Sequence, residues 1–256
     1  MLLGRFAVER GGMTVTPPAG HPSLLVKLVA LHGPLAADEA IEALWPDVDA
    51  MMGRRRLRNL LNRVKMASGE LVVRERGSLR LIDGVEVDLV RFDAAADLAL
   101  RHPGAAAVET AVALYRGELL PEDRYDDWSA AERERLRRRH LDVLDAGAEC
   151  AHDRGDLAEA CRLLDISLQA EPLDERRAVL AARLLAERGR LVAANDVLRR
   201  TVRSLAGLGL APGDELVAAL AAAPRPTVGS HDAPQRAGRR RGRCRRMPPR
   251  PSRHDT

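Results

Sequence analysis

The sequence contains little cysteine, few aromatic residues and no long apolar run. Aromatic side chains make up 2 % of its 256 residues, and Cys150, Cys161 and Cys244 form no CxxC pair. That pattern favours reduced thiols over a disulfide or zinc framework. No segment approaches the roughly 18 uninterrupted apolar residues of a membrane span, and the N-terminus is a poor secretory signal. These absences predict a cytoplasmic protein without a membrane partner or a structural metal.

Motifs of catalysis are also missing. The sequence has no GxSxG motif, no Rossmann glycine fingerprint and no P-loop. The acidic cluster at 122–127 lacks the ligand ladder of a calcium loop and is better interpreted as the entry to a helix. His140 and His152 stand outside any HExxH context, and Cys150 and Cys161 are expected to be buried free thiols. We therefore expect no enzyme activity, no catalytic residue, no cofactor and no metal.

The positive charge is concentrated at the C-terminal end. The whole chain has a formal net charge of +4, but residues 224–256 contain ten arginines against two aspartates, so the remainder is acidic. This segment has almost no apolar content, which predicts a disordered tail. Its arginines suit contact with DNA phosphates, and an extension without a dedicated role is an equally good interpretation.

Residues 1–93 have the pattern of a winged helix-turn-helix with β-hairpins. Two strands, three helices and two further strands are expected in this order: 2–9, 13–16, 24–31, 38–45, 53–67, 71–73 and 79–81. Turns at 10–12 and 75–78 join the two strand pairs, and Gly33-Pro34 ends the first helix. We expect this region to be an α+β domain.

Residues 94–223 have a helical pattern almost throughout. The segments RGDLAEACRLL (154–164) and RGRLVAANDVL (188–198) repeat after 34 residues, which is the tetratricopeptide period. Their glycines suit the turn between paired helices, and Ala160 and Ala194 suit close packing. The predicted fold is therefore mainly α: a winged helix-turn-helix (1–93), an all-α tetratricopeptide-like domain (94–223) and a tail (224–256).

The third predicted helix has two distinct faces. Leu57, Leu60, Leu61 and Val64 form a buried stripe, which turns Arg and Asn side chains to the other side. Arg and Asn can read guanine and adenine edges in the major groove. An ordinary solvated basic face is the alternative, but a following basic hairpin favours DNA. The predicted DNA-binding residues are Arg54, Arg55, Arg56, Arg58, Asn59, Asn62, Arg63, Lys65 and Arg76.

Several segments resemble the SARP-type transcriptional activators. EALWPD (42–47), RLRNLLNRVK (56–65) and VEVDLVRFD (85–93) are similar to their response-regulator-type winged helix. ALYRGELLPEDRYDDWSAAERERLRRRHLDVL (113–144) and LGLAPGDEL (208–216) are similar to their bacterial transcriptional activator domain. The resemblance implies an activator that binds promoter DNA and contacts RNA polymerase. Ala36-Ala37 depart from it, because a hydroxyl residue usually caps the second helix there.

The loop from Trp45 to Met52 is a candidate activation surface. It precedes the helix expected in the groove, and Asp47 and Asp49 offer carboxylates to a basic polymerase surface. Alternatively, both aspartates stabilise the N-terminus of the next helix. Trp45 and Trp128 are expected to be core residues of the winged helix and of the first helical pair.

Two functions remain open from the sequence. The first is a sequence-specific transcriptional regulator with double-stranded DNA and RNA polymerase as partners, and with a homodimer or protein partner contacted through the helical domain. The second is an interaction scaffold whose winged helix no longer binds DNA. The first is the leading interpretation. The near-neutral charge of residues 1–93 keeps the second open, because many DNA-binding domains are frankly basic.

Overall fold

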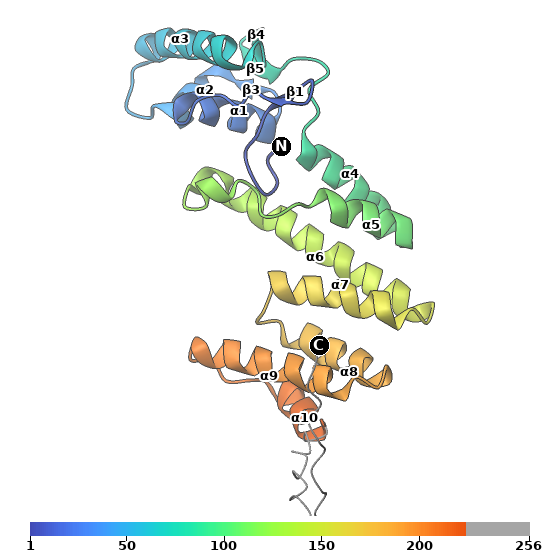
Figure 1. Ribbon diagram of the computed structural model, residues 1–256. Coiled ribbons are helices and arrows are strands. Elements are labelled where there is room, and N and C mark those ends of the chain that lie inside the picture. The colour runs from blue at the N-terminus through green and yellow to red at the C-terminus, as the bar shows by residue number, and fades with distance from the viewer. Residues whose placement is uncertain (224–256) are drawn as a thin grey trace, which may run out of the picture. The chain divides into compact units, whose positions relative to one another are not determined.

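The computed structural model describes residues 1–223, so the predicted disordered tail lies outside the described residues. Its elements confirm the expected mainly α fold, with a winged helix-turn-helix followed by a series of helices (Figure 1). No helix in the described part is long and apolar enough to cross a membrane.

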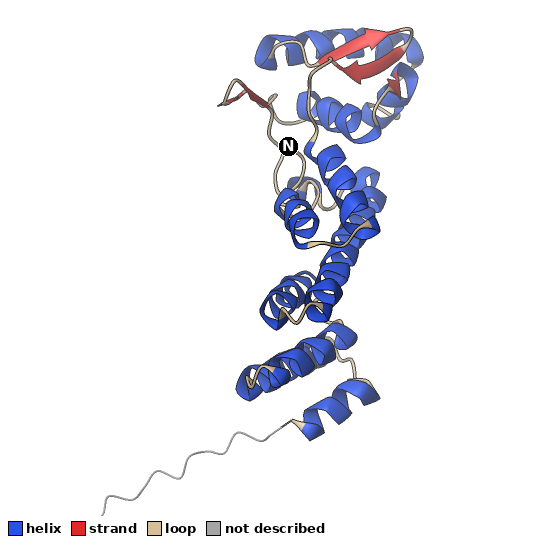
Figure 2. Ribbon diagram, turned by 90° about the vertical axis from the view of Figure 1, so that its right-hand side faces the viewer, coloured by secondary structure: helices blue, strands red, loops and turns tan. Residues whose placement is uncertain are grey.

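The winged helix-turn-helix consists of three helices and a small antiparallel sheet (Figure 2). The helices are α1 (His21–His32), α2 (Ala37–Leu44) and α3 (Ala50–Ser68). The strands lie in the order β3 (Leu35–Ala36), β5 (Ser78–Leu81) and β4 (Val72–Glu75). Leu25, Leu57 and Leu79 are fully buried between helices and sheet, so the apolar stripes of the sequence form one core.

Strand β3 was not expected from the sequence. Its two residues are too few to produce an alternating pattern, and they become a strand because Leu35 and Ala36 pair with Leu79 and Ser78. Helix α2 then starts without a hydroxyl cap. The Glu39 carboxylate accepts a hydrogen bond from the Ala36 N–H at 3.3 Å instead, as the third residue of a capping box does.

The N-terminal segment differs from the strand expected at 2–9. Only β1 (Glu9–Arg10) and β2 (Met13–Thr14) form a short hairpin there. The N–H groups of Leu2 and Leu3 both donate to the Asp88 carboxylate, at 2.8–2.9 Å. Both leucines are buried in the core of the helical region, so partners distant in sequence replace the expected strand.

The helical region consists of antiparallel helices. Successive elements are α4 (Asp88–Arg101), α5 (Ala105–Leu114), η1 (Pro121–Asp123), η2 (Asp127–Ser129), α6 (Ala130–Asp153), α7 (Leu157–Ala170), α8 (Glu175–Glu187), α9 (Leu191–Gly207) and α10 (Asp214–Ala222). Gly155 and Gly189, with φ of 77° and 72°, make the turns within the pairs α6–α7 and α8–α9. Ala160 and Ala194 are buried, as the 34-residue repeat predicted.

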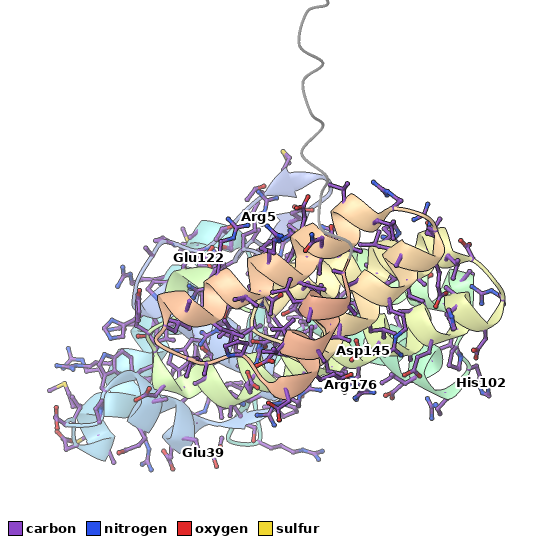
Figure 3. All side chains as sticks on the ribbon, turned by 90° about the horizontal axis from the view of Figure 1, so that it is seen from below. Arg5, Glu39, His102, Glu122, Asp145 and Arg176 are labelled. Atoms are coloured by element: carbon purple, nitrogen blue, oxygen red, sulfur yellow. The ribbon has the colours of Figure 1, made fainter. Side chains whose placement is uncertain are left out.

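A cluster of contacts joins the winged helix to the helical region. Lys27 of α1 is buried, and its Nζ lies 2.5 Å from the Asp123 carboxylate and 4.9 Å from the centre of the Phe6 ring. Glu122 accepts the Phe6 N–H at 3.0 Å and lies beside the segment that carries Arg5 (Figure 3). The acidic cluster at 122–127 therefore has structural partners.

The two tryptophans have different positions. Trp45 is partly buried against the winged-helix core, with its ring 5.3 Å from that of His21. Trp128 packs against both the winged-helix core and the helical core. It therefore contributes to the junction as well as to the first helices of the helical region.

Candidate DNA interface

Helix α3 is built to bury one face and leave the other free. The Asp49 carboxylate caps its start by accepting the N–H groups of Met51 and Met52, both at 3.0 Å. Leu57, Leu60 and Val64 are buried against the rest of the winged helix. The opposite face is in solvent.

Close packing against α2 depends on Gly53. This glycine is buried in the first turns of α3, and a Cβ atom there would collide with Cγ2 of Ile41. The two helices of the helix-turn-helix can therefore approach each other only where α3 lacks a side chain.

The structure places all the sequence-predicted residues of α3 on the surface. They are Arg54, Arg55, Arg56, Arg58, Asn59, Asn62, Arg63 and Lys65, and each is exposed. Their electrostatic partners differ, however, and this difference divides the face into two groups.

Three of these basic residues have a neighbour within the winged helix. Arg54 lies 3.6 Å from the Asp38 carboxylate, and Lys65 lies 3.0 Å from that of Glu70. The Arg56 guanidinium lies 6.0 Å from the centre of the Trp45 ring. In contrast, Arg55, Arg58 and Arg63 have no carboxylate within 4.0 Å among the residues described.

The wing presents one exposed arginine at its tip. Arg76 and Gly77, with φ of 49° and 91°, form the two-residue turn between β4 and β5, and Arg76 is exposed. Arg80 on β5 is engaged instead, with its guanidinium 2.8 Å from Glu75 and 2.9 Å from Asp83. The hydrogen bond that Arg80 donates to Glu75 lowers the pKa of the Glu75 carboxyl below its ordinary value. Arg76 at the tip therefore has no carboxylate neighbour among the described residues, unlike Arg80.

The loop before α3 is shorter than the expected span from Trp45 to Met52. Because Asp49 caps the helix, α3 begins at Ala50 and the loop ends at Asp49. Asp49 thus has the structural role that the sequence left as an alternative. Asp47 is exposed and accepts no hydrogen bond in the described structure.

The remaining sequence candidates do not assemble into a metal or catalytic centre within residues 1–223. No group of three or more His, Cys, Asp or Glu side chains there could hold a metal ion. Cys150 and Cys161 are free thiols, as expected, but they are partly exposed rather than buried. Cys150 lies in the last turn of α6, and its thiol donates to the Pro103 carbonyl at 3.2 Å.

Comparison with known proteins identifies the helical region. Residues 87–222 match the model of the bacterial transcriptional activator domain, which is more than half of the chain. The chain belongs to this family. The resemblance of its sequence to the SARP-type activators is thereby confirmed.

The fold is also found in a solved structure. Mycobacterium tuberculosis EmbR, in complex with a low-affinity phosphopeptide, is similar with a TM-score of 0.62 and 20 % sequence identity. The match covers 86 % of this chain and 63 % of the EmbR chain, so this chain spans less than two thirds of EmbR. No curated protein matches this sequence.

Proposed function

We propose that this regulator binds double-stranded promoter DNA with α3 in the major groove and Arg76 at the flanking backbone. The observation that supports this proposal is the unpaired face of α3. Arg55, Arg58 and Arg63 have no carboxylate neighbour in the described residues and alternate with Asn59 and Asn62. A free guanidinium can bind guanine through two hydrogen bonds, and an asparagine amide can do so with adenine.

The paired residues of the same surface suit phosphate contact. Arg54 and Lys65 are exposed, and their carboxylate partners lie within the same small domain. Surface ion pairs contribute little free energy, so a DNA phosphate can replace the carboxylate at small cost. This division assigns base reading to one group of residues and positioning to the other.

The DNA affinities of substituted chains test this assignment. A preferred duplex is first selected from a random pool with the full chain. Arg58→Ala or Asn62→Ala then should weaken binding to that duplex by on the order of 1–3 kcal/mol while hardly changing binding to random DNA. Arg183→Ala, an exposed arginine on α8, is the matched control and should have no effect on either.

Arg76→Ala and Lys65→Ala should give a different result. Each should weaken binding to all duplexes by a similar factor. The slope of log affinity against log salt concentration should fall in magnitude by about one. Unchanged affinity of both Arg58→Ala and Asn62→Ala for the preferred duplex would contradict the proposed orientation of α3. Failure of the full chain to enrich any duplex would favour the interaction scaffold instead.

We further propose that the regulator activates transcription through Asp47 in the loop before α3. The loop would lie beside the duplex when α3 is in the groove, and the exposed Asp47 carboxylate suits a basic polymerase surface. Asp47→Asn should lower transcription in a purified system with little change in DNA affinity. Asp49→Asn, which retains most of the cap, should leave transcription near normal. Full transcription by Asp47→Asn would contradict this role.

A further inference from the structure

A cavity of about 540 Å³ lies beside the winged helix, and no residue of α3 lines it. It is enclosed by the N-terminal segment, α1, the ends of the wing strands and the segment 82–87 that leads into α4. Its size is within the range of small-molecule sites, which are often found where two domains meet. No element that carries the proposed DNA-reading residues lines it.

The walls of this cavity combine apolar and polar surface in nearly equal shares. Val26 and Leu71 are buried in its floor, while Phe6, Ile82 and Val87 are partly buried around it. Phe6 packs against both the winged-helix core and the helical core. An apolar molecule in the cavity would therefore contact the junction between the two regions.

Two cations at the rim of the cavity have no acidic partner among the described residues: Arg10, and the Met1 ammonium, which donates to the Ala7 carbonyl at 2.6 Å. The three acidic residues of the rim each have an arginine neighbour, and the pairs are Glu9–Arg5 at 3.7 Å, Asp83–Arg80 at 2.9 Å and Glu86–Arg91 at 3.3 Å. Arg10 also lines the cavity, and within the described residues no carboxylate lies within 4.0 Å of it. We propose that the cavity binds a small amphipathic carboxylate, with its apolar body beside Phe6 and its carboxylate on Arg10.

Arg10 also connects the cavity to the end of α3. Its Nη2 donates to the Glu70 carbonyl at 3.3 Å, one residue beyond the C-cap Gly69. A Cβ atom on Gly69 would collide with the Arg10 guanidinium, so this side chain rests directly on the helix end. A carboxylate bound in the cavity would compete with the Glu70 carbonyl for the Arg10 guanidinium, because a charged acceptor forms the stronger hydrogen bond. Ligand binding would thus alter the C-terminal turn of α3.

Calorimetric titration of the full chain with decanoate tests the site. Decanoate should bind saturably with one site per chain, and decanol of the same chain length should bind more weakly. Arg10→Gln should weaken decanoate binding at least tenfold and leave decanol binding unchanged. The matched control is Arg183→Gln, because Arg183 is exposed on α8 and neither lines the cavity nor pairs with a residue that does.

Two further measurements separate the site from general hydrophobic binding. Ala30→Trp, at a partly buried lining position of α1, should fill the cavity and abolish binding of both ligands, with folding checked by circular dichroism. Decanoate should also change the hydrogen exchange of the amides at 68–70 in the unmodified chain and not in Arg10→Gln. No saturable binding of decanoate, or equal binding by Arg10→Gln or a folded Ala30→Trp, would overturn the proposal. The titration contains no DNA, so these outcomes are independent of the proposed DNA interface.

Discussion

Helices α3 and α6 contain similar clusters of arginine and use them in opposite ways. On α3, Arg55, Arg58 and Arg63 are exposed and have no carboxylate partner among the described residues. On α6, each arginine of the segment 133–139 forms an ion pair. The pairs include Arg133–Glu118, Arg135–Asp93, Arg137–Glu134, Arg138–Glu134 and Arg139–Asp97. The same residue type is thus committed to the fold in one helix and available to a ligand in the other.

The difference arises from the neighbours. Helix α6 carries glutamates at spacings of three and four from its own arginines, and α4 adds Asp93 and Asp97 from the facing side. Helix α3 contains no acidic residue after its cap. Arginine abundance alone therefore does not predict a nucleic-acid surface.

The largest expected difference between the two helices concerns Arg133. Its guanidinium is buried and donates to the carbonyls of Leu119, Asp123 and Arg124. Arg133→Ala removes the guanidinium donor from these carbonyls, of which Asp123 keeps the Asp126 N–H, and we expect it to lower the free energy of unfolding in urea by about 4 kcal/mol. Arg58→Ala on α3 should change it by less than about 0.5 kcal/mol. Equal free energies of unfolding for Arg133→Ala and Arg58→Ala would contradict this difference between α6 and α3.

The second prediction concerns the buried face of α6. His140 is buried, stacks on Tyr115 with ring centres 4.0 Å apart, and has no hydrogen-bond partner for Nδ1 in the described structure. Burial lowers the pKa of His140 from its ordinary value of 6.5 to about 4. Between these values the unfolded chain binds a proton that the folded chain does not, so stability falls as the pH is lowered.

The expected loss between pH 6.5 and pH 4 is about 3 kcal/mol. Urea unfolding at a series of pH values measures it, and His140→Phe should flatten the curve over this window. His102→Gln, at an exposed helix end (Figure 3), is the control and should leave the slope unchanged. An unchanged slope in His140→Phe would assign the acid sensitivity to other groups.

The third prediction concerns two buried glycines, one on α3 and one on α6. A Cβ atom at Gly53 of α3 would collide with Ile41, and one at Gly147 of α6 would lie 2.6 Å from Cγ1 of Val108. We expect Gly53→Ala and Gly147→Ala each to lower the free energy of unfolding by about 2 kcal/mol, because overpacking outweighs the higher helix propensity of alanine. Gly207→Ala on α9, where the added atom has open space, should instead be neutral or stabilising. A gain in stability from Gly53→Ala would show that α2 and α3 can move apart without a loss of stability.

The smallest expected effect is at the surface of α6. The Arg138 side chain is 73 % exposed and pairs with Glu134 four residues earlier. Arg138→Gln should cost no more than about 0.5 kcal/mol at low salt, and less in high salt, because solvent and ions screen such pairs. A larger loss would mean that the α6 network acts as one cooperative unit.

Much of the fold follows from local sequence. The apolar spacing of Leu57, Leu60 and Val64 defined the buried face of α3, and the 34-residue repeat located the turns at Gly155 and Gly189. Strand β3 and the course of residues 2–8 did not follow from it. Both depend on partners far along the chain, namely β5 for β3 and Asp88 for the N–H groups of Leu2 and Leu3.

The sequence is enough to identify the residues of α3 that could face a ligand, because helical periodicity fixes the face opposite a buried stripe. It did not determine which charges on that face remain free. Arg55 and Arg58 differ from Arg54 only in having no acidic neighbour within the described chain, and Asp49 differs from Asp47 only in reaching the first N–H groups of α3. Ion pairs and caps depend on distances of a few ångströms between elements, and tertiary packing alone sets those distances.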